Sequence, residues 1–442
     1  MSATRSAGWG MGVLPRIVRG EGSYLYDSTG KRYLDGSGGP AAFSLGHGHP
    51  EVNAAIAVQL SKVACGYRYL FSSEPLEELT DLLLALAGSD YGHIVFAGSG
   101  SEAVEGALKV ALQYWDARGM PSKRRFIARE RSYHGNTLGA LSVSGFQERR
   151  RPFEGSLLPV SFVSAANAYR PLRGLTGAAL VKALADELEE KIRALGADQV
   201  AAFIFEPVVG AAGGAVPAPE GYAQAVRAVC ARHQVLMIAD EVMCGSGRCG
   251  TWRALEHDRL VPDILAVGKG LAGGYVPLAA TLVTRPVGAA ILDAHGAFLT
   301  GHTYTGHTTA CAAGLAVQRI IQRDQLLARV RERGEVLRWE LRSALERSPV
   351  VGDVRGRGYL IGIEFVRDRS TREPLPAERG FSQEVGRRAF EDGLIVYPCA
   401  GNVGGTAGDT VIVAPPYNAS DAELAELVER LSRAIGRTLA GG

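Results

Sequence analysis

The chain has 442 residues, of which 46% are hydrophobic and 21% are charged, and its formal net charge is +2. This composition is typical of a soluble globular protein, and the length predicts a large domain accompanied by a smaller one. The near-neutral charge gives no electrostatic basis for binding nucleic acid or a membrane surface, and no run of about 18 apolar residues predicts a membrane span.

The N-terminal segment and the cysteines indicate the cellular compartment. Residues 1–20 lack the continuous apolar stretch of a secretory signal. The six cysteines form no CxxC pair, and no nearby Cys or His pair completes a metal site. We therefore expect reduced cysteines, no bound metal and a cytoplasmic location.

Predicted strands and helices alternate through the middle of the chain. Near the N-terminus, residues 24–35 predict an antiparallel hairpin around a polar turn. Residues 93–97 predict a strand that ends in a glycine-rich turn, and residues 101–115 carry apolar side chains at helical spacing. Further strands are predicted at 200–205, 235–239, 264–267 and 278–283, and further helices at 179–195 and 222–233. This alternation predicts an α/β fold with a mainly parallel central sheet covered by helices.

The C-terminal part has a different pattern. A long helical stretch is predicted at 309–346, strands at 354–366 and 411–413, a mobile glycine-rich loop at 400–408, and a last amphipathic helix at 421–439, capped by Ser420 or Asn418. We therefore predict a large domain at 51–320 and a small α+β domain built from both termini, residues 1–50 and 321–442.

A glycine-rich turn, Gly98-Ser-Gly-Ser-Glu102, lies between a predicted strand and a predicted helix. Free N–H groups at such a helix start hold phosphate well. The turn is neither a Walker loop nor a complete dinucleotide fingerprint, and Ser101 could instead cap the helix. Taken alone, phosphate binding and capping are equally good interpretations.

Two charged residues follow buried strands. Asp240 comes directly after the apolar segment 235–239, at the position where α/β folds gather ligands, although it could also cap the next turn. Lys269 stands between glycines after the strand at 264–267, whereas most lysines are solvated surface groups. Small apolar neighbours would keep its amine partly desolvated, which lowers the pKa and makes the amine a usable nucleophile.

Six motifs, taken together and in order, carry a resemblance to a known family. They are AGSGSEAVEGALK, SYHGNT, FEPVVG, IADEVMCGSGR, VGKGLAGG and GHTYTGH, and the flanking strings LYDSTGKRYLDGSGG, VRGRGYLIGIEF and VIVAPP extend the match over nearly the whole chain. The sequence resembles the class III aminotransferases, also called ω-aminotransferases, which are fold-type I enzymes dependent on pyridoxal phosphate.

The resemblance implies specific roles. Lys269 would hold pyridoxal phosphate as a Schiff base and shuttle a proton, and Asp240 would pair with the protonated pyridine nitrogen. Thr303 would reach the phosphate of a neighbouring subunit, which implies a homodimer with shared active sites and leaves larger assemblies open. The other implied cofactor contacts are Gly100 and Ser101 at the phosphate, Tyr133 and Val242 on opposite faces of the ring, His134 beside Tyr133, and Glu206 near the ring's 3′-oxygen. Each has a purely structural alternative, such as core packing for Tyr133 or a turn hydroxyl for Thr303.

The substrate contacts depart from the pattern of relatives that act on glutamate. Those relatives often carry a Glu and an Arg where this chain has Ala211 and Ile412, and no arginine occurs in residues 400–408. Because both charged partners are missing together, we expect no glutamate-type carboxylate switch and favour alanine and pyruvate as the donor pair. Arg68 is a candidate replacement anchor, or simply a surface arginine.

Other departures are milder. Met243, Cys249 and Thr308 replace the family's usual Gln, Thr and Pro without removing a group that the chemistry needs. Ala41 and Phe43 occupy positions that line the pocket in relatives, and the small Ala41-Ala42 pair predicts room for a bulky amine.

The sequence therefore predicts transfer of an amino group from a primary amine or ω-amino acid to a keto acid by a ping-pong mechanism. Racemisation, decarboxylation and aminomutase chemistry use the same lysine, aspartate and phosphate cup, so the motifs do not separate these reactions. A non-catalytic regulatory homologue is a second alternative, although it would be expected to lack Lys269. A nicotinamide-dependent dehydrogenase would need a complete glycine fingerprint.

Overall fold

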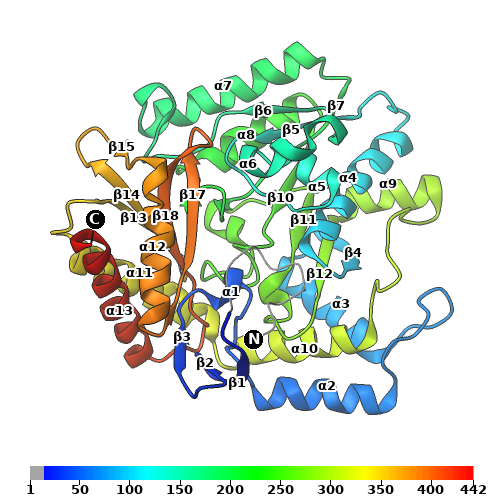
Figure 1. Ribbon diagram of the computed structural model, residues 1–442. Helices are drawn as coiled ribbons and strands as arrows, with labels where there is room; N and C mark the ends of the chain where they lie inside the picture. The colour runs from blue at the N-terminus through cyan, green and yellow to red at the C-terminus, as the bar shows by residue number, and fades with distance from the viewer. Residues whose placement is uncertain (1–13, 442) are drawn as a thin grey trace.

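The computed structural model describes residues 14–441, and a seven-stranded sheet forms its centre (Figure 1). Strand β12 is antiparallel to both of its neighbours, and the other adjacent pairs are parallel, so the prediction of a mainly parallel sheet is confirmed. The strands, in their order across the sheet, are β4 (Tyr91–Ala97), β12 (Ala279–Thr284), β11 (Ile264–Val267), β10 (Leu236–Asp240), β7 (Val200–Phe205), β5 (Arg125–Arg129) and β6 (Val160–Val163).

Helices cover both faces of this sheet because its strands are apolar on both sides. In β7, Phe203 and Phe205 pack into one core cluster, while Ala202 and Ile204 pack into another. The first face is covered by α3 (Glu74–Ala87), α7 (Gly177–Leu195), α8 (Tyr222–Arg232) and α10 (Thr308–Arg323), and the second by α4 (Gly100–Ala117), α5 (Leu138–Ser142) and α9 (Arg285–His295).

The two ends of the chain meet in a second region. Strand β16 (Leu394–Ile395) pairs in parallel with β3 (Arg32–Asp35), which joins the N-terminal strands to the C-terminal segment. In Figure 1 the helices α11 (Leu326–Leu345), α12 (Phe381–Glu391) and α13 (Asp421–Ala440) gather at the left of the molecule. The remaining strands of this region are β1 (Ile17–Glu21), β2 (Tyr24–Asp27), β13 (Val351–Arg357), β14 (Leu360–Asp368), β15 (Glu373–Pro374), β17 (Tyr397–Val403) and β18 (Ala407–Val413). The domain boundaries at 50 and 320 stay a prediction.

Most predicted elements are confirmed. Strands β7 and β11 have the predicted bounds, and the hairpin at 24–35 is formed by β2 and β3. Helix α13 begins after Ser420, whose hydroxyl accepts a hydrogen bond from the Glu423 N–H. None of the helices in residues 14–441 is long and apolar enough to cross a membrane.

Three predictions were wrong in detail. The stretch 309–346 is two helices, α10 and α11, because Gln325 adopts a left-handed conformation with φ +52°. The stretch 354–366 is a hairpin that turns at Gly358. The glycine-rich segment 400–408 is not a loop, since most of it belongs to the paired strands β17 and β18. Strands β5 and β6 were not predicted, nor were α2 (Pro50–Lys62), α3, α9 and α12.

Candidate active site

The predicted site residues lie at one edge of the central sheet. Asp240 ends β10, Glu206 follows β7, and Lys269 follows β11. These strands are adjacent and parallel, so their carboxyl ends open to the same side, which is where α/β folds bind ligands. All three side chains line a cavity of about 760 Å³ together with Ser101 and Tyr133.

Lys269 projects from a strained backbone position. Its φ is +46°, in the left-handed region that is uncommon for a residue with a side chain, and it lies two residues after the end of β11. Burial lowers the pKa of its ammonium from 10.5 to about 8, while the carboxylates of Asp240 and Glu206 oppose that shift. A neutral amine, which is the nucleophilic form, is therefore accessible near neutral pH.

Asp240 is held in a fixed orientation by its neighbours. Its Oδ2 lies 2.8 Å from His134 Nδ1, and its Oδ1 accepts a hydrogen bond from the Val242 N–H at 3.0 Å. Asp240 is 4% exposed and His134 is 3% exposed. A buried carboxylate oriented in this way can stabilise a protonated ring nitrogen in the cavity.

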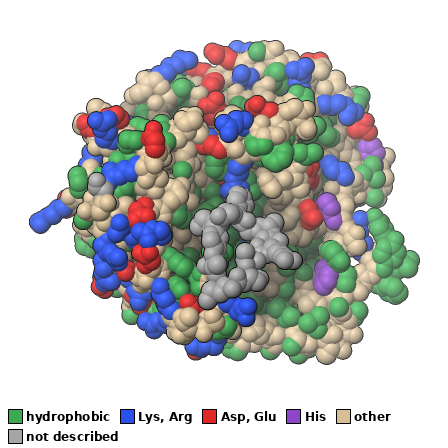
Figure 2. Space-filling model, in the orientation of Figure 1, with side chains coloured by type: hydrophobic (Ala, Val, Ile, Leu, Met, Phe, Trp, Pro, Cys, Tyr) green, Lys and Arg blue, Asp and Glu red, His purple; other side chains and the backbone are tan. Residues whose placement is uncertain are grey.

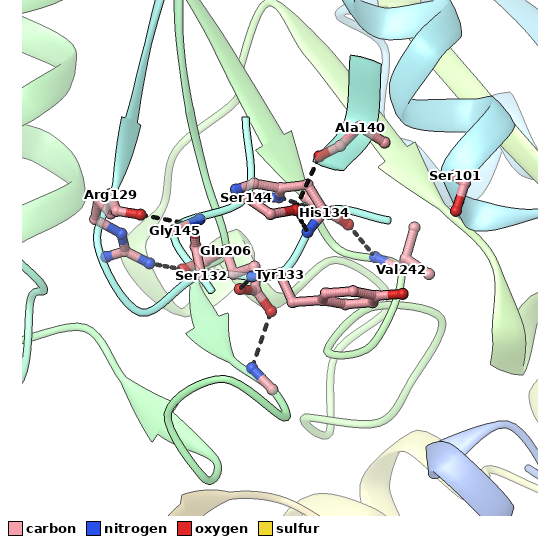
Figure 3. Close-up of polar contacts among 12 residues, drawn as sticks. Ser101, Arg129, Ser132, Tyr133, His134, Ala140, Ser144, Gly145, Glu206 and Val242 are labelled. Atoms are coloured by element: carbon pink, nitrogen blue, oxygen red, sulfur yellow. Dashed lines mark hydrogen bonds and ion pairs between the residues drawn. The ribbon is translucent and has the colours of Figure 1, made fainter. Parts of the chain in front are cut away.

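Glu206 fixes the segment that carries Tyr133. Its carboxylate accepts hydrogen bonds from the N–H groups of Tyr133 and Gly210, both at 2.9 Å (Figure 3). Burial raises the pKa of Glu206, His134 opposes this shift, and Asp240 adds to it. Glu206 thus ties the Tyr133 loop to the end of β7 and keeps the aromatic ring beside the cavity.

The start of α4 lies at the cavity, as expected for a phosphate-binding turn. Ser99 rather than Ser101 caps the helix, because its hydroxyl accepts from the Glu102 N–H at 3.2 Å. The Ser101 hydroxyl lines the cavity and accepts a hydrogen bond from the Asn136 N–H at 2.9 Å. A Cβ on Gly100 would lie 2.6 Å from Val242 Cγ1, so only glycine allows this close packing. The helix N-terminus is therefore open to a phosphate.

These residues fit pyridoxal phosphate. The cup at Gly100 and Ser101 suits the phosphate, Asp240 suits the ring nitrogen, and the Lys269 amine suits the aldehyde carbon. Tyr133 and Val242 line the same cavity, so an aromatic face and an apolar side chain are available to a flat ring. No group of His, Cys, Asp and Glu side chains within residues 14–441 is arranged to hold a metal.

Four predicted residues lie outside the set that lines this cavity. Ala41 is buried in an apolar cluster, and Phe43 packs against the His47 ring at 4.7 Å, while Pro40 lines the cavity in their place. Arg68 stacks on Tyr69, with its guanidinium carbon 4.5 Å from the ring centre. Thr303 is exposed on the surface of the described structure.

The sequence prediction missed four residues of the cavity wall: Pro40, Arg149, Tyr397 and Pro398. Arg149 belongs to the short helix α6 (Gln147–Arg150), and Tyr397 begins β17. No motif marks Arg149, which is the first of three consecutive arginines. Tyr397 belongs to the segment just before 400–408, and only the pairing of β17 with β18 brings it to the cavity.

The lowered pKa of Lys269 predicts how cofactor uptake depends on pH. Because only the neutral amine attacks, the rate of covalent attachment should rise about tenfold per pH unit and level off near pH 8. Absorption changes after mixing cofactor-free protein with pyridoxal phosphate measure this rate. A rate that keeps rising toward pH 10.5, the ordinary value for lysine, would contradict the burial described here.

The packing at Gly100 predicts a second effect. Gly100→Ala should weaken cofactor binding by about 10-fold, because the added methyl group would push Val242 out of place. The double variant Gly100→Ala with Val242→Ala should recover part of the affinity, since the shortened side chain makes room. Fluorescence titration with pyridoxal phosphate gives the dissociation constants of both variants and of Val242→Ala alone, and losses that simply add would show that the contact is unimportant.

Comparisons with known proteins show the family of the chain. The family described as aminotransferase class-III matches residues 8–435. An uncharacterized aminotransferase of Bacillus subtilis, YodT, is 42% identical, and the match covers 95% of each chain. An adenosylmethionine-8-amino-7-oxononanoate aminotransferase of Geobacter sulfurreducens is 36% identical, with 96% of this chain and 92% of that protein covered.

Solved structures give the same result. An (S)-enantioselective ω-transaminase from Thermomicrobium roseum is 35% identical and superposes with a TM-score of 0.90, with 96% of this chain and 93% of the other covered. An amine transaminase from an uncultivated Pseudomonas species, solved with pyridoxal phosphate bound, is also 35% identical with a TM-score of 0.91, covering 98% and 97%.

Proposed function

The chain belongs to the class III aminotransferases, enzymes that depend on pyridoxal phosphate, and from that premise we propose how it works. An amine or ω-amino acid first gives its amino group to the cofactor, and a keto acid such as pyruvate then takes it, in a ping-pong sequence. The observation that carries this proposal is the cavity in which Lys269, Asp240 and the start of α4 meet.

Several residues of the cavity have a defined task in this proposal. Pyridoxal phosphate, when bound, would supply an electron sink for cleavage of a bond at the substrate's Cα. The neutral Lys269 amine would take the proton from Cα and pass it to the cofactor carbon that receives the amino group, and it would move a proton in the opposite direction in the second half-reaction. Asp240, oriented by His134, would keep a proton on the ring nitrogen. Tyr133 and Val242 would contact the ring, and the N–H groups at Gly100 and Ser101 would bind the phosphate.

The apolar corner of the site favours alanine and pyruvate over glutamate. Ala211 lines the cavity, and Ile412 is fully buried in an apolar cluster that also holds Met243. Neither Ala211 nor Ile412 offers a charged partner, so the second carboxylate of glutamate would lose hydration that these two residues do not replace. The small side chain of Ala211 also leaves room for the substituent of a primary amine.

We propose a homodimer in which Thr303 reaches the partner's active site. An exposed apolar patch supports this assembly, and Figure 2 shows hydrophobic side chains on the segment that protrudes between α2 and α3. The position of Arg68 beside Gly301 joins this segment to the one that carries Thr303. Such a large apolar patch marks a protein interface. Its most exposed members are Tyr67, Tyr69, Leu70, Phe71, Leu299 and Tyr304, each between 62% and 72% exposed.

Charges in this patch should break the dimer. The double variant Leu70→Glu with Phe71→Glu should be monomeric and should lose most of its activity, because both side chains would be buried in the interface. Analytical ultracentrifugation gives the mass. Trp339→Glu is the matched control, since Trp339 is equally exposed but lies on α11, and it should leave the dimer intact. A fully active monomer would contradict the proposal that two subunits share each active site.

A cytoplasmic location is part of the same proposal. All six cysteines are free in the structure, and five of them are buried. Reduced cysteines are usual in that compartment.

The function is tested by following the absorption of the cofactor-loaded protein. Alanine, added alone, should abolish the visible band and yield pyruvate, and fresh pyruvate should restore the band. A band that alanine leaves unchanged would remove alanine as the donor, and a panel of primary amines would then identify the true one. Formation of the mirror-image amino acid or of carbon dioxide without a keto product would instead establish racemisation or decarboxylation.

A further inference from the structure

Arg149 is the cationic side chain on the part of the cavity wall that has no proposed contact with the cofactor. Of the described residues that line the cavity, Lys269, Asp240, Glu206 and His134 already have tasks at the cofactor, and Arg149 is the one arginine. Its guanidinium carbon lies 4.9 Å from the centre of the Tyr133 ring. The positive charge of Arg149 therefore lies close to the aromatic ring of Tyr133, which is proposed to contact the cofactor.

The neighbours of Arg149 fix its position. Glu148 pairs with Arg131 at 2.9 Å, and Arg131 also donates to the carbonyl of Gly401 in the β17–β18 hairpin. The buried Arg150 donates to the carbonyls of Leu141 at 2.9 Å and Ser144 at 3.1 Å. Because both flanking residues are anchored, α6 presents Arg149 to the cavity from a rigid support.

Aromatic groups hold the guanidinium on this wall. Besides Tyr133, the Phe146 ring centre lies 5.1 Å from the guanidinium carbon, and the charge of Arg149 acts on the Tyr397 side chain, which lines the same cavity. Burial raises the pKa of Tyr397 to about 12, so its hydroxyl stays protonated. Tyr397 pairs directly with Ile412 in the β17–β18 ladder, so Arg149 brings a positive charge beside the apolar corner.

We propose that Arg149 binds the carboxylate of the amino acid and keto acid substrates. A planar guanidinium can hold a carboxylate through two parallel hydrogen bonds, which is the geometry that such substrates require. The inference rests on the proposed function, because it assigns a recognition residue to the same site. Arg149 takes the place of Arg68 as the proposed carboxylate anchor within the subunit, since Arg68 does not line this cavity.

The aromatic surroundings explain how one site could accept substrates with and without a carboxylate. Ring faces stabilise a cation through cation–π contacts whether or not an anion is present. When an amine without a carboxylate binds, Arg149 keeps its contacts with Tyr133 and Phe146, and the apolar substituent packs against the same rings. The wall therefore needs no mobile acidic residue to neutralise the arginine between the two half-reactions.

The test compares substrates that carry a carboxylate with substrates that do not. The Arg149→Gln protein loaded with pyridoxal phosphate is mixed with alanine or 1-phenylethylamine in one half-reaction, and the protein loaded with pyridoxamine phosphate is mixed with pyruvate or propanal in the other. The apparent KM for alanine and pyruvate should rise about 10- to 100-fold, because a charge-assisted hydrogen-bond pair is lost. The values for 1-phenylethylamine and propanal should stay within about threefold.

Three controls separate recognition from folding. Arg149→Lys keeps the charge but not the planar fork and should give an intermediate loss for the carboxylate substrates. Arg151→Gln is the matched control, because Arg151 is exposed and absent from the cavity wall, and it should change nothing. Propanoate, which cannot react, should bind Arg149→Gln more weakly by the same factor, as measured by its effect on cofactor absorption.

Each outcome is decisive. Equal losses with all four substrates, or unchanged KM values for alanine and pyruvate, would overturn the assignment of Arg149 and leave the proposed function standing. A wild-type protein that converts neither alanine nor any amine would overturn the proposed function itself. A selective loss with the carboxylate substrates, together with weaker propanoate binding, would establish Arg149 as the anchor.

Discussion

Replacing Lys269 by alanine should lower the rate of amino transfer by about 10³-fold or more, because the same amine attaches the cofactor and moves the Cα proton. The structure gives no substitute for this group. Among the described residues that line the cavity, Lys269 is the one lysine, and His134 is committed to Asp240. The cofactor should still bind through its phosphate and ring, although no longer covalently.

Two measurements check this prediction. Stopped-flow absorption gives the rate of each half-reaction, and borohydride reduction followed by mass spectrometry should label the peptide that contains Lys269 in the wild type only. Lys109→Ala is the control, because Lys109 is an exposed lysine on α4. Transfer at more than a tenth of the wild-type rate in Lys269→Ala would refute the central role of this residue.

Asp240→Asn should reduce the rate of the same half-reactions by about 10²- to 10³-fold, which is the size of effect seen when one electrostatic contact to a developing charge is lost. The side chain keeps its shape, and its amide oxygen can still accept the hydrogen bond from His134, although the bond from the Val242 N–H is then lost. Most of the loss in rate should come from the missing negative charge, which no longer favours a proton on the ring nitrogen.

A modified cofactor distinguishes this electrostatic role from a structural one. Asp240→Ala protein loaded with pyridoxal phosphate methylated on the ring nitrogen should recover at least tenfold in rate, since that ring keeps its positive charge without help from Asp240. The comparison uses the same variant loaded with ordinary pyridoxal phosphate. If methylation brings no recovery, Asp240 acts mainly by holding His134 and the loop that carries it.

Local sequence signals were enough to bring Lys269 and Asp240 to one cavity. Strand β11 is a continuous apolar run followed by Gly268 and Lys269, and Asp240 ends the apolar strand β10. A residue at the end of a parallel strand can be assigned to the binding edge without knowing the rest of the fold. The positions of these residues are therefore encoded within about ten residues of sequence.

The substrate half depends on contacts between distant segments, which the sequence pattern does not reveal. The three arginines at 149–151 have the same chemistry, yet Arg149 lines the cavity, Arg150 is buried against carbonyl groups and Arg151 is exposed. Only the packing of α6 beside β17 gives the three arginines different surroundings. The same reason explains the error at 400–408, because the glycines there suggested a loop while pairing with β18 supplied the hydrogen bonds of a strand.

The pairing of β3 with β16 has a consequence for synthesis of the protein. Leu34 pairs with Leu394, so the sheet that contains the N-terminal strands stays incomplete until nearly the whole chain has left the ribosome. Contacts so distant in sequence form slowly, and unpaired strand edges are exposed to other chains while they wait. The central sheet, whose strands all lie between residues 91 and 284, can form first and provide the surface on which the two ends later assemble.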